Sequence, residues 1–367
     1  METINLEFLG PTSIQLHGSR ISALTRDNGI NVRFHPLPAD YQSGRVKVLK
    51  RIQIRKALEK HIHHIIAKGD LANTVWCHSQ PPTLLNRLLI DLTKRFSTLL
   101  DIRDIYQEWN YHGFLKQQLE RWEQVSTMKA VSAITYAHEG FGPYLRKDIT
   151  DRGKLHFISN GADETIFFPE KTDGLNGKLI VYCGTINPVN NISFFLRVMK
   201  RALRMEKTLR LIIVGYGRDS GIVSEWIRSG RLPRTTFIDR NVNQETLAYY
   251  YHQADYAVCS INPFASVYYH TCIPNKVFEA LCTGTPIISF QGQVMTDLSR
   301  SWFNAIHNFD ITRRGVDLEI ISRCIVALPS VTYNEKEKIA KQAHSVFPFR
   351  LRAKRFREVL LQILERE

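Results

Sequence analysis

Short apolar segments alternate with amphipathic ones along the first half of this chain, and this alternation restricts the folds that it can adopt. Six apolar segments have the length and composition of buried strands: Leu6–Leu9, Ile30–Phe34, Thr74–Cys77, Phe96–Ile102, Ala130–Tyr136 and Leu155–Ile158. Segments with helical spacing lie between them, such as Ser19–Arg26 and Leu84–Thr93. Strands that alternate with helices form parallel sheets covered by helices on both faces. The first half is therefore predicted to be a Rossmann-like α/β domain.

The alternation stops at a polar stretch, residues 169–177, and then starts again. That stretch contains one proline and two glycines and has no periodicity, as is typical of a linker. The strands predicted after it are Lys178–Cys183, Leu209–Val214, Thr236–Ile238, Tyr256–Cys259 and Pro286–Phe290. The helices predicted between these strands are Phe194–Leu203, Ser224–Arg228, Glu245–Tyr251 and Asn275–Cys282.

Two α/β domains follow from this pattern and from the length of 367 residues, which exceeds what one core usually supports. We predict a first domain over residues 1–168, a linker over 169–177 and a second domain over 178–345. Residues 346–367 are predicted to form an amphipathic helix. Its apolar stripe consists of Leu351, Phe356, Val359, Leu360 and Ile363, and its basic side of Arg350, Arg352, Lys354, Arg355 and Arg357.

Composition excludes several classes of protein. Hydrophobic residues make up 44% of the chain and charged residues 23%, as in ordinary globular proteins. No apolar run is long enough for a transmembrane helix, and Met1–Glu7 carries two acids where a secretion signal is basic. The cysteines never have the spacing of a zinc site or disulfide framework, so we expect buried thiols in the cytoplasm: Cys77, Cys183, Cys259, Cys272, Cys282 and Cys324.

The formal net charge of +14 suggests an anionic partner: nucleic acid, an anionic membrane surface or a highly phosphorylated substrate. No nucleic-acid-binding motif is present, so nucleic acid is not expected. The segment Arg45–Lys68 contains eight Lys or Arg residues against one acid, Glu59. Its apolar residues share one helical face, which predicts either a Rossmann helix with a solvated basic side or a dock for anionic phospholipid.

The stretch Thr271–Pro286 is the most informative for chemistry. Pro274 suits the first turn of a short helix, and Gly284 suits its end. A helix N-terminus with Lys276 beside it offers N–H groups and positive charge to a diphosphate. Glu279, one turn further on, can accept hydrogen bonds from a vicinal diol such as that of ribose. The alternative interpretation makes both residues ordinary positions on an exposed helix.

This stretch resembles the signature of family 4 of the glycosyltransferases, in which P-(S/N)-K-hydrophobic-aromatic-E precedes an A-x-G-x-P ending. Further segments resemble that family in the same order along nearly the whole chain: Asp101–Tyr106, Ile158–Asp163 with Phe168-Pro169, Val181–Thr185, Leu211–Gly217 and Ala254-Asp255. Each segment alone is common among proteins. Their order makes the resemblance specific.

The resemblance implies a GT-B fold, in which two Rossmann-like domains face a central cleft and the C-terminal helix crosses back to the first domain. It also implies a retaining hexosyltransferase of bacterial cell-surface polysaccharide synthesis that needs no metal or other cofactor. The donor would be a nucleotide-diphosphate sugar, with UDP preferred to GDP, and the acceptor a glycan or a lipid-linked sugar. Such an enzyme would be cytoplasmic and peripheral on the inner face of the membrane.

The resemblance also assigns roles to residues. Glu279 would bind ribose, and the other donor-binding residues would be Lys276, Asn275, Gly184, Thr185, Gly215, Gly217 and Thr271. Asp104 and Arg103 would be catalytic residues lining the acceptor side. The remaining acceptor-side residues would be Gly10, His17, His78 and His138, although the histidines are also typical of ordinary loop positions. No residue is expected to bind a metal.

Two positions depart from the family pattern. Thr271 stands where many members have a first glutamate, and the segment after Gly184 lacks the usual Lys-Gly pair. Lys276, Arg218 or Arg240 would then supply the cation for the diphosphate. Two alternatives therefore stay open: a sugar-nucleotide epimerase of the same fold, and a non-catalytic partner protein that binds nucleotide sugars.

Overall fold

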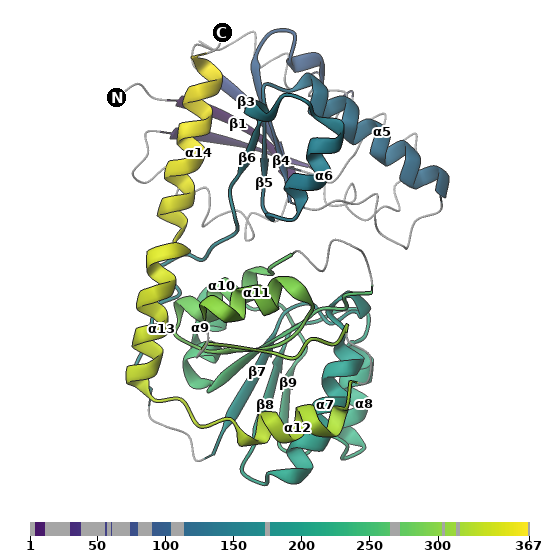
Figure 1. The fold of residues 1–367 in the computed structure, drawn as a ribbon, viewed down its shortest axis with the longest axis vertical. Coiled ribbons are helices and arrows are strands. Elements are labelled where there is room, and N and C mark those ends of the chain that lie inside the picture. Colours follow the sequence, from purple (N-terminus) through teal and green to yellow (C-terminus); the bar gives the residue numbers. More distant parts are fainter. Residues whose placement is uncertain are drawn as a thin grey trace. The chain divides into compact units, whose positions relative to one another are not determined.

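A computed structural model describes most of the second half of the chain and parts of the first. The described residues are 4–11, 30–37, 56, 60, 74–79, 90–103, 114–172, 177–264, 272–302, 305–312 and 316–365. The chain divides into two compact units (Figure 1). The first unit consists of Met1–Ser159 and Phe349–Glu367, and the second of Asn160–Pro348.

The first unit contains a parallel sheet with the strand order β2-β1-β3-β4-β5-β6. Its strands are β1 (Ile4–Pro11), β2 (Ile30–Leu37), β3 (Thr74–Ser79), β4 (Ser97–Ile102), β5 (Ala133–Tyr136) and β6 (Leu155–Phe157). Every pairing between them is parallel. The alternation in the sequence therefore predicted the strands of this unit correctly, with ends that differ by a few residues.

Helices cover this sheet on two sides: α5 (Phe114–Ala130), α6 (Phe141–Asp148) and α14 (Phe349–Leu364). Figure 1 shows α14 along one side of the sheet and α5 and α6 along the other. The apolar stripe of α14 packs into a core cluster with strand residues such as Leu6, Val75 and Leu99. The C-terminal helix thus returns to the first unit, as the GT-B resemblance predicted.

The second unit contains a parallel sheet with the order β12-β11-β10-β7-β8-β9. Its strands are β7 (Leu179–Cys183), β8 (Arg210–Val214), β9 (Thr235–Ile238), β10 (Tyr256–Ser260), β11 (Ile287–Phe290) and β12 (Ile306–Asn308). In chain order this is the 3-2-1-4-5-6 arrangement of a Rossmann sheet. The strand β12 is short and was not predicted from the sequence.

Successive strand residues of this sheet point to opposite faces, and each face has its own helices. Ile180 and Tyr182 of β7 pack in one cluster with α7 (Ile192–Met205), α8 (Ser220–Arg228) and α12 (Leu318–Ala327). Val181 and Cys183 pack in the other cluster, with α9 (Gln244–Gln253), α10 (Asn275–Cys282), α11 (Gln293–Ser301) and α13 (Tyr333–Val346). The result is a three-layer sandwich, which Figure 1 shows in its lower half.

The boundary between the units lies between Ser159 and Asn160, before the predicted domain end at 168. The two boundaries differ because Ala162 and Phe167, both 1% exposed, pack into the core of the second unit. His252 also holds the following residues, since its Nε2 lies 2.7 Å from the Phe168 carbonyl oxygen. Its Nδ1 lies 2.9 Å from a carboxylate oxygen of Glu170. The start of the predicted linker is therefore part of the second unit.

Three basic side chains of the second unit cap the C-terminal ends of helices. Lys336 Nζ donates to the carbonyls of His252 and Ala254 at the end of α9. Lys178 Nζ donates in the same way to Ile325 and Val326 near the end of α12. Arg234 donates to Glu206 after α7. These contacts suit the negative end of the helix dipole and account for part of the positive charge.

The structure also bears on the expectations about the cysteines and about membrane-spanning helices. Five of the cysteines are buried, but Cys324 on α12 is exposed, so the prediction that all six are buried was wrong for Cys324. Among the helices in the described part of the chain, none is both long and apolar enough to span a bilayer. Of the basic segment Arg45–Lys68, only Lys56 and Lys60 are described, and both are exposed.

Candidate functional site

The sheet of the second unit has its topological switch point between β7 and β10. The chain leaves β7 toward α7 on one face and leaves β10 toward α10 on the other. In open α/β sheets, ligands bind outside the carboxyl ends of the strands at such a point. Gly184 directly follows β7 and Gly215 directly follows β8, so both predicted donor-binding glycines lie at this edge.

Glycines allow the two loops at this edge to touch. Gly215 has a φ of +144°, and a Cβ there would lie 1.9 Å from the carbonyl oxygen of Gly184. A Cβ on Gly217 would lie 2.3 Å from the carbonyl oxygen of Ile186. Side chains cannot occupy such positions without moving the backbone. The loops after β7 and β8 therefore form one glycine-lined surface.

Lys276 extends from the first turn of α10 to this surface. A Cβ on Gly184, whose φ is +140°, would lie 2.8 Å from the Lys276 Nζ. The same ammonium lies 4.5 Å from the centre of the Tyr182 ring and 3.5 Å from Asn190 Oδ1. Lys276, one of the three cations predicted to replace the missing lysine, therefore contacts the loop after β7. Arg218 instead forms an exposed ion pair with Asp219, at 3.3 Å.

The N-terminus of α10 has no side-chain cap. Pro274 is its N-cap residue, and the first bond is a tight one from the Val277 N–H to the Pro274 carbonyl, at 3.0 Å. The first N–H groups of a helix have no partner within the helix itself. Asn275, which opens the helix, is exposed. The helix therefore presents N–H groups and the positive end of its dipole next to Lys276.

Glu279 lies one turn further along α10 and is half-buried. Burial raises the pKa of its carboxyl from 4.5 to about 7, although Lys276 and the Tyr251 hydroxyl act in the opposite direction. Tyr251 does not fully compensate the carboxylate, because its hydroxyl has no partner in hydrogen-bonding geometry within the described residues. Among the described residues, the groups around this carboxylate therefore do not fully offset the effect of burial on its pKa.

The segment that replaces the family's Lys-Gly pair forms a compact turn. Asn187 Oδ1 accepts hydrogen bonds from the backbone N–H and the side-chain amide of Asn190, at 2.9 and 3.0 Å. Asn191 adopts a left-handed conformation with φ +47° and is the N-cap residue of α7. Asn187 therefore supports Asn190, which in turn contacts Lys276. Thr185 at the start of this turn is exposed.

In the first unit, the structure describes some of the predicted acceptor-side residues. Arg103 follows β4 and forms a half-buried ion pair with Asp101, whose other carboxylate oxygen accepts from the Thr135 hydroxyl at 2.7 Å. His138 follows β5, is 9% exposed and contacts the Phe141 ring. Arg103 is therefore held by a carboxylate, and its catalytic role stays a prediction.

Gly10 lies near the end of β1, and His78 lies near the end of β3. The two strands are neighbours, with Leu9 opposite His78, and the strand order of the first sheet reverses between them. These positions therefore lie at the switch point of the first sheet. Three predicted residues, Asp104, His17 and Thr271, lie outside the described residues.

Sequence reasoning missed two aromatic residues of the site in the second unit. Tyr182 and Tyr251 are buried, at 0% and 1% exposure, and looked like ordinary core positions in a strand and a helix. It also missed Gln291, a fully buried amide after β11 that donates to the Cys272 carbonyl at 2.7 Å and so fixes the segment before α10. A polar amide next to an apolar strand end was the one signal in the sequence that pointed to Gln291.

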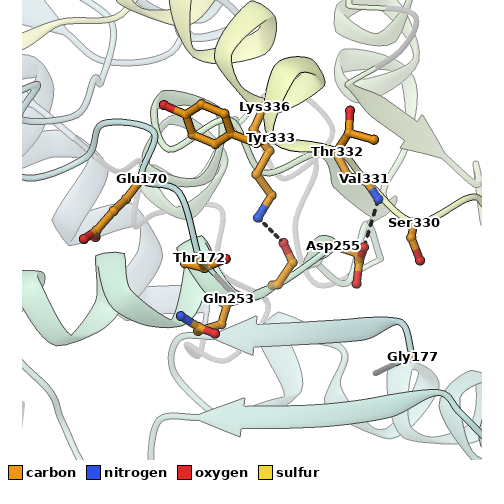
Figure 2. A pocket seen from close by; sticks show the side chains of 11 residues that line it. Glu170, Thr172, Gly177, Gln253, Asp255, Ser330, Val331, Thr332, Tyr333 and Lys336 are labelled. Atoms are coloured by element: carbon orange, nitrogen blue, oxygen red, sulfur yellow. Dashed lines mark hydrogen bonds between the residues drawn. The ribbon is translucent and has the colours of Figure 1, made fainter. Parts of the chain in front are cut away.

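A hollow of about 270 Å³ lies at the opposite, amino edge of the same sheet (Figure 2). Asp255 and Lys336 line it, and both groups are bonded within the protein. The carboxylate of Asp255 accepts from the N–H groups of Leu179 and Val331, at 2.8 and 2.9 Å. Lys336 Nζ donates to the Ala254 carbonyl at 2.7 Å. These charges support the fold, so the hollow lacks the uncompensated groups of the α10 edge.

Comparison with known proteins identifies the fold and a family match in the second unit. The fold is GT-B, a pair of Rossmann-like units. Within the second unit, residues 177–304 match the family model described as "Glycosyl transferases group 1", and this range contains every donor-binding residue predicted from the sequence. No curated protein sequence matches the chain.

Solved structures with the same fold cover almost the whole chain at low sequence identity. Sucrose-phosphate synthase from Thermosynechococcus elongatus has a TM-score of 0.73 at 13% identity and covers 99% of this chain and 100% of its own. Anabaena HepE in complex with UDP has a TM-score of 0.67 at 13% identity, covering 98% and 100%. The N-terminal domain of trehalose-6-phosphate phosphatase from Candida albicans has a TM-score of 0.68 at 13% identity, covering 98% and 97%.

Proposed function

We propose that the chain is a glycosyltransferase that takes a sugar from a nucleotide-diphosphate donor bound at the carboxyl edge of the second unit. The observation that carries this proposal is the position of Lys276, which lies at the open N-terminus of α10 against the loop of Gly184. The family match over residues 177–304 and the GT-B fold support a glycosyltransferase.

The chemistry of this site follows from its charges. When the glycosidic bond to the donor breaks, negative charge grows on the diphosphate, and donors fixed in advance lower the barrier. Lys276 and the first N–H groups of α10 are such donors. The Glu279 carboxylate, whose pKa stays raised despite Lys276 and Tyr251, accepts hydrogen bonds from the ribose hydroxyls. Positive groups of the protein thus take the place that a divalent metal has in other transferases, so we propose a metal-independent reaction.

The finer assignment is UDP as the nucleotide, retention of anomeric configuration and a glycan or lipid-linked acceptor. HepE was solved with UDP and with UDP-glucose, which supports the choice of UDP. A cytoplasmic enzyme of bacterial cell-surface synthesis, bound peripherally to the membrane, fits this reaction. The exposed Lys56 and Lys60 support the basic segment Arg45–Lys68 as the surface for anionic phospholipid.

Calorimetric titration with UDP tests the proposed site. We expect UDP to bind the wild type and to bind Lys276→Gln at least ten-fold more weakly, because one charge-assisted contact to a phosphate is lost. Lys341→Gln, an exposed lysine on α13, is the matched control and should bind UDP like the wild type. Equal binding of UDP by wild type and Lys276→Gln would place the donor elsewhere.

Incubation with UDP-sugars distinguishes the proposed reaction from the alternatives. Transfer or slow hydrolysis with release of UDP supports a transferase, and should continue when EDTA is present. Formation of an epimeric sugar nucleotide would instead indicate an epimerase. Binding without either product would indicate a non-catalytic partner, and loss of turnover with EDTA would contradict the metal-independent reaction.

A further inference from the structure

Tyr182 lies beneath the proposed diphosphate site, and its ring is held between two groups. The Phe195 ring of α7 stacks on it at 5.4 Å, with 25° between the planes. The Lys276 ammonium lies 4.5 Å from its centroid. Its hydroxyl donates to the carbonyl oxygen of Thr185 at 2.8 Å. One buried side chain therefore contacts both the cation and the loop after β7.

The ring face attracts the ammonium without neutralising it. Within the described residues, no carboxylate lies within ion-pairing distance of Lys276 Nζ, which instead donates to the amide oxygen of Asn190. A carboxylate in the place of the ring would attract the lysine more strongly but would repel a phosphate. A cation over an aromatic face keeps its full charge for an incoming anion.

The Tyr182 hydroxyl acts on the second part of the site. It tethers Thr185, the residue after Gly184, and so fixes the turn whose missing Cβ leaves room for the lysine. Burial raises the pKa of the Tyr182 phenol, which keeps it neutral and able to donate. The ring and the hydroxyl thus hold the two sides of the contact between Lys276 and Gly184.

We propose that Tyr182 is a positioning residue for diphosphate recognition: its ring holds the Lys276 ammonium, and its hydroxyl holds the Gly184–Thr185 turn. This inference rests on the proposed donor site at α10. A purely structural role as a core aromatic would make the residue important for stability but indifferent to whether a ligand carries phosphates. That difference is measurable.

The test compares UDP with uridine by calorimetry in wild type, Tyr182→Leu and Tyr182→Phe. We expect Tyr182→Leu to lower the affinity for UDP about 5- to 30-fold and the affinity for uridine by less than about two-fold. The reason is that the ring acts through the cation that contacts the phosphates. Tyr182→Phe, which keeps the ring, should lose no more than about three-fold for UDP. Phe195→Leu removes the other ring of the stack and should leave the ratio of UDP to uridine affinity unchanged.

A double-mutant cycle sharpens the result. In a Lys276→Met background, Tyr182→Leu should lower UDP affinity by no more than about three-fold, the loss expected from the hydroxyl alone, because the cation that the ring holds is absent. If Tyr182→Leu does not fold, fluorinated phenylalanines incorporated at position 182 withdraw charge from the ring face at nearly constant shape, and UDP affinity should fall with each added fluorine.

Three results would overturn the positioning role. These are equal losses of affinity for UDP and uridine, additive effects in the double-mutant cycle beyond the loss from the hydroxyl, and a UDP affinity that does not change with fluorination. Failure of the wild type to bind UDP would instead overturn the proposed function. The two failures are therefore distinguishable.

Discussion

The charged side chains at the two edges of the second unit's sheet differ in how they are bonded. At the amino edge, Asp255 accepts two backbone N–H groups, and Lys336 and Lys178 each donate to two carbonyls. At the carboxyl edge, Lys276 faces an aromatic ring and an amide, and Glu279 is half-buried with a raised pKa. Charges are satisfied at the first edge and left available at the second.

The residues that stabilise this unit and the residues that are available to a ligand therefore lie at different edges of its sheet. A buried group that is fully bonded holds neighbouring elements together, as Lys336 joins α13 to the end of α9. A group that lacks partners destabilises the folded protein until a ligand supplies them. Variants of the charged groups at the amino edge should therefore affect stability alone, whereas variants of the charged groups at the carboxyl edge should affect binding and can even stabilise.

The largest expected effect comes from Gly215→Ala, which tests how tightly the loops of the carboxyl edge are packed. The new Cβ would lie 1.9 Å from the Gly184 carbonyl oxygen at a φ of +144°, so the backbone must move. We expect the free energy of unfolding to fall by about 3–5 kcal/mol, measured by guanidinium denaturation.

Gly221→Ala in α8 is the matched control for this prediction. Nothing lies within 4 Å of the position that its new Cβ would take, and alanine favours a helix, so stability should stay equal or rise by up to about 1 kcal/mol. If the two variants have the same stability, the loops are not in the close contact described above.

Lys336→Met tests the amino edge and should lower the free energy of unfolding by about 2 kcal/mol, because the carbonyls of His252 and Ala254 lose their donor. Burial lowers the pKa of Lys336 from 10.5 to about 8. Between these values the unfolded chain holds a proton that the folded chain has released, so wild-type stability rises with pH. The deficit of the variant should therefore grow from pH 8 to pH 10.

UDP affinity is the second measurement for Lys336→Met. It should equal that of the wild type, since the altered contacts lie at the amino edge. Lys341→Met, an exposed position on the same helix, controls for the loss of one positive charge. If Lys336→Met weakens UDP as strongly as loss of Lys276 does, the separation between the two edges is wrong.

The smallest expected change in stability, and of opposite sign, comes from Glu279→Gln. Burial raises the pKa of Glu279 from 4.5 to about 7, so the folded chain holds a proton that the unfolded chain has released between these values. Stability therefore falls as pH rises through this window, and the full cost of the buried carboxylate is present above pH 7. The neutral amide should raise the free energy of unfolding by about 1–2 kcal/mol at pH 8 and by nothing at pH 4.5.

The same variant should bind UDP more weakly at pH 8, and wild-type affinity should decline from pH 8 to pH 6 as the carboxyl gains its proton. Glu335→Gln is the control, and its expected change in stability has the opposite sign. Hydrogen bonds from Thr332 lower the pKa of Glu335 in the capping box of α13, so its loss should slightly destabilise above pH 4.5 without changing UDP affinity. A destabilised Glu279→Gln with unchanged binding would make Glu279 a structural residue.

Local sequence determined the elements of this protein. The predicted bounds of α10, Asn275–Cys282, agree with the structure because Pro274 cannot continue a helix backward and Gly284 ends it at a φ of +80°. The strands of both sheets except β12 were predicted because buried parallel strands are continuous apolar runs. The strand β12 has three residues, too few to give such a run, and the helices α5, α6, α11, α12 and α13 were not predicted.

The tertiary structure alone decided which of these elements meet. No local pattern states that the order of the second sheet reverses between β7 and β10, and that reversal brings Lys276 against Gly184 and over Tyr182. Likewise, Ala162 and Phe167 read as the end of the first domain but pack in the core of the second. Strand order and core membership depend on contacts between residues far apart in the chain, whereas helix ends and strand runs depend on neighbours, and a sequence records only neighbours directly.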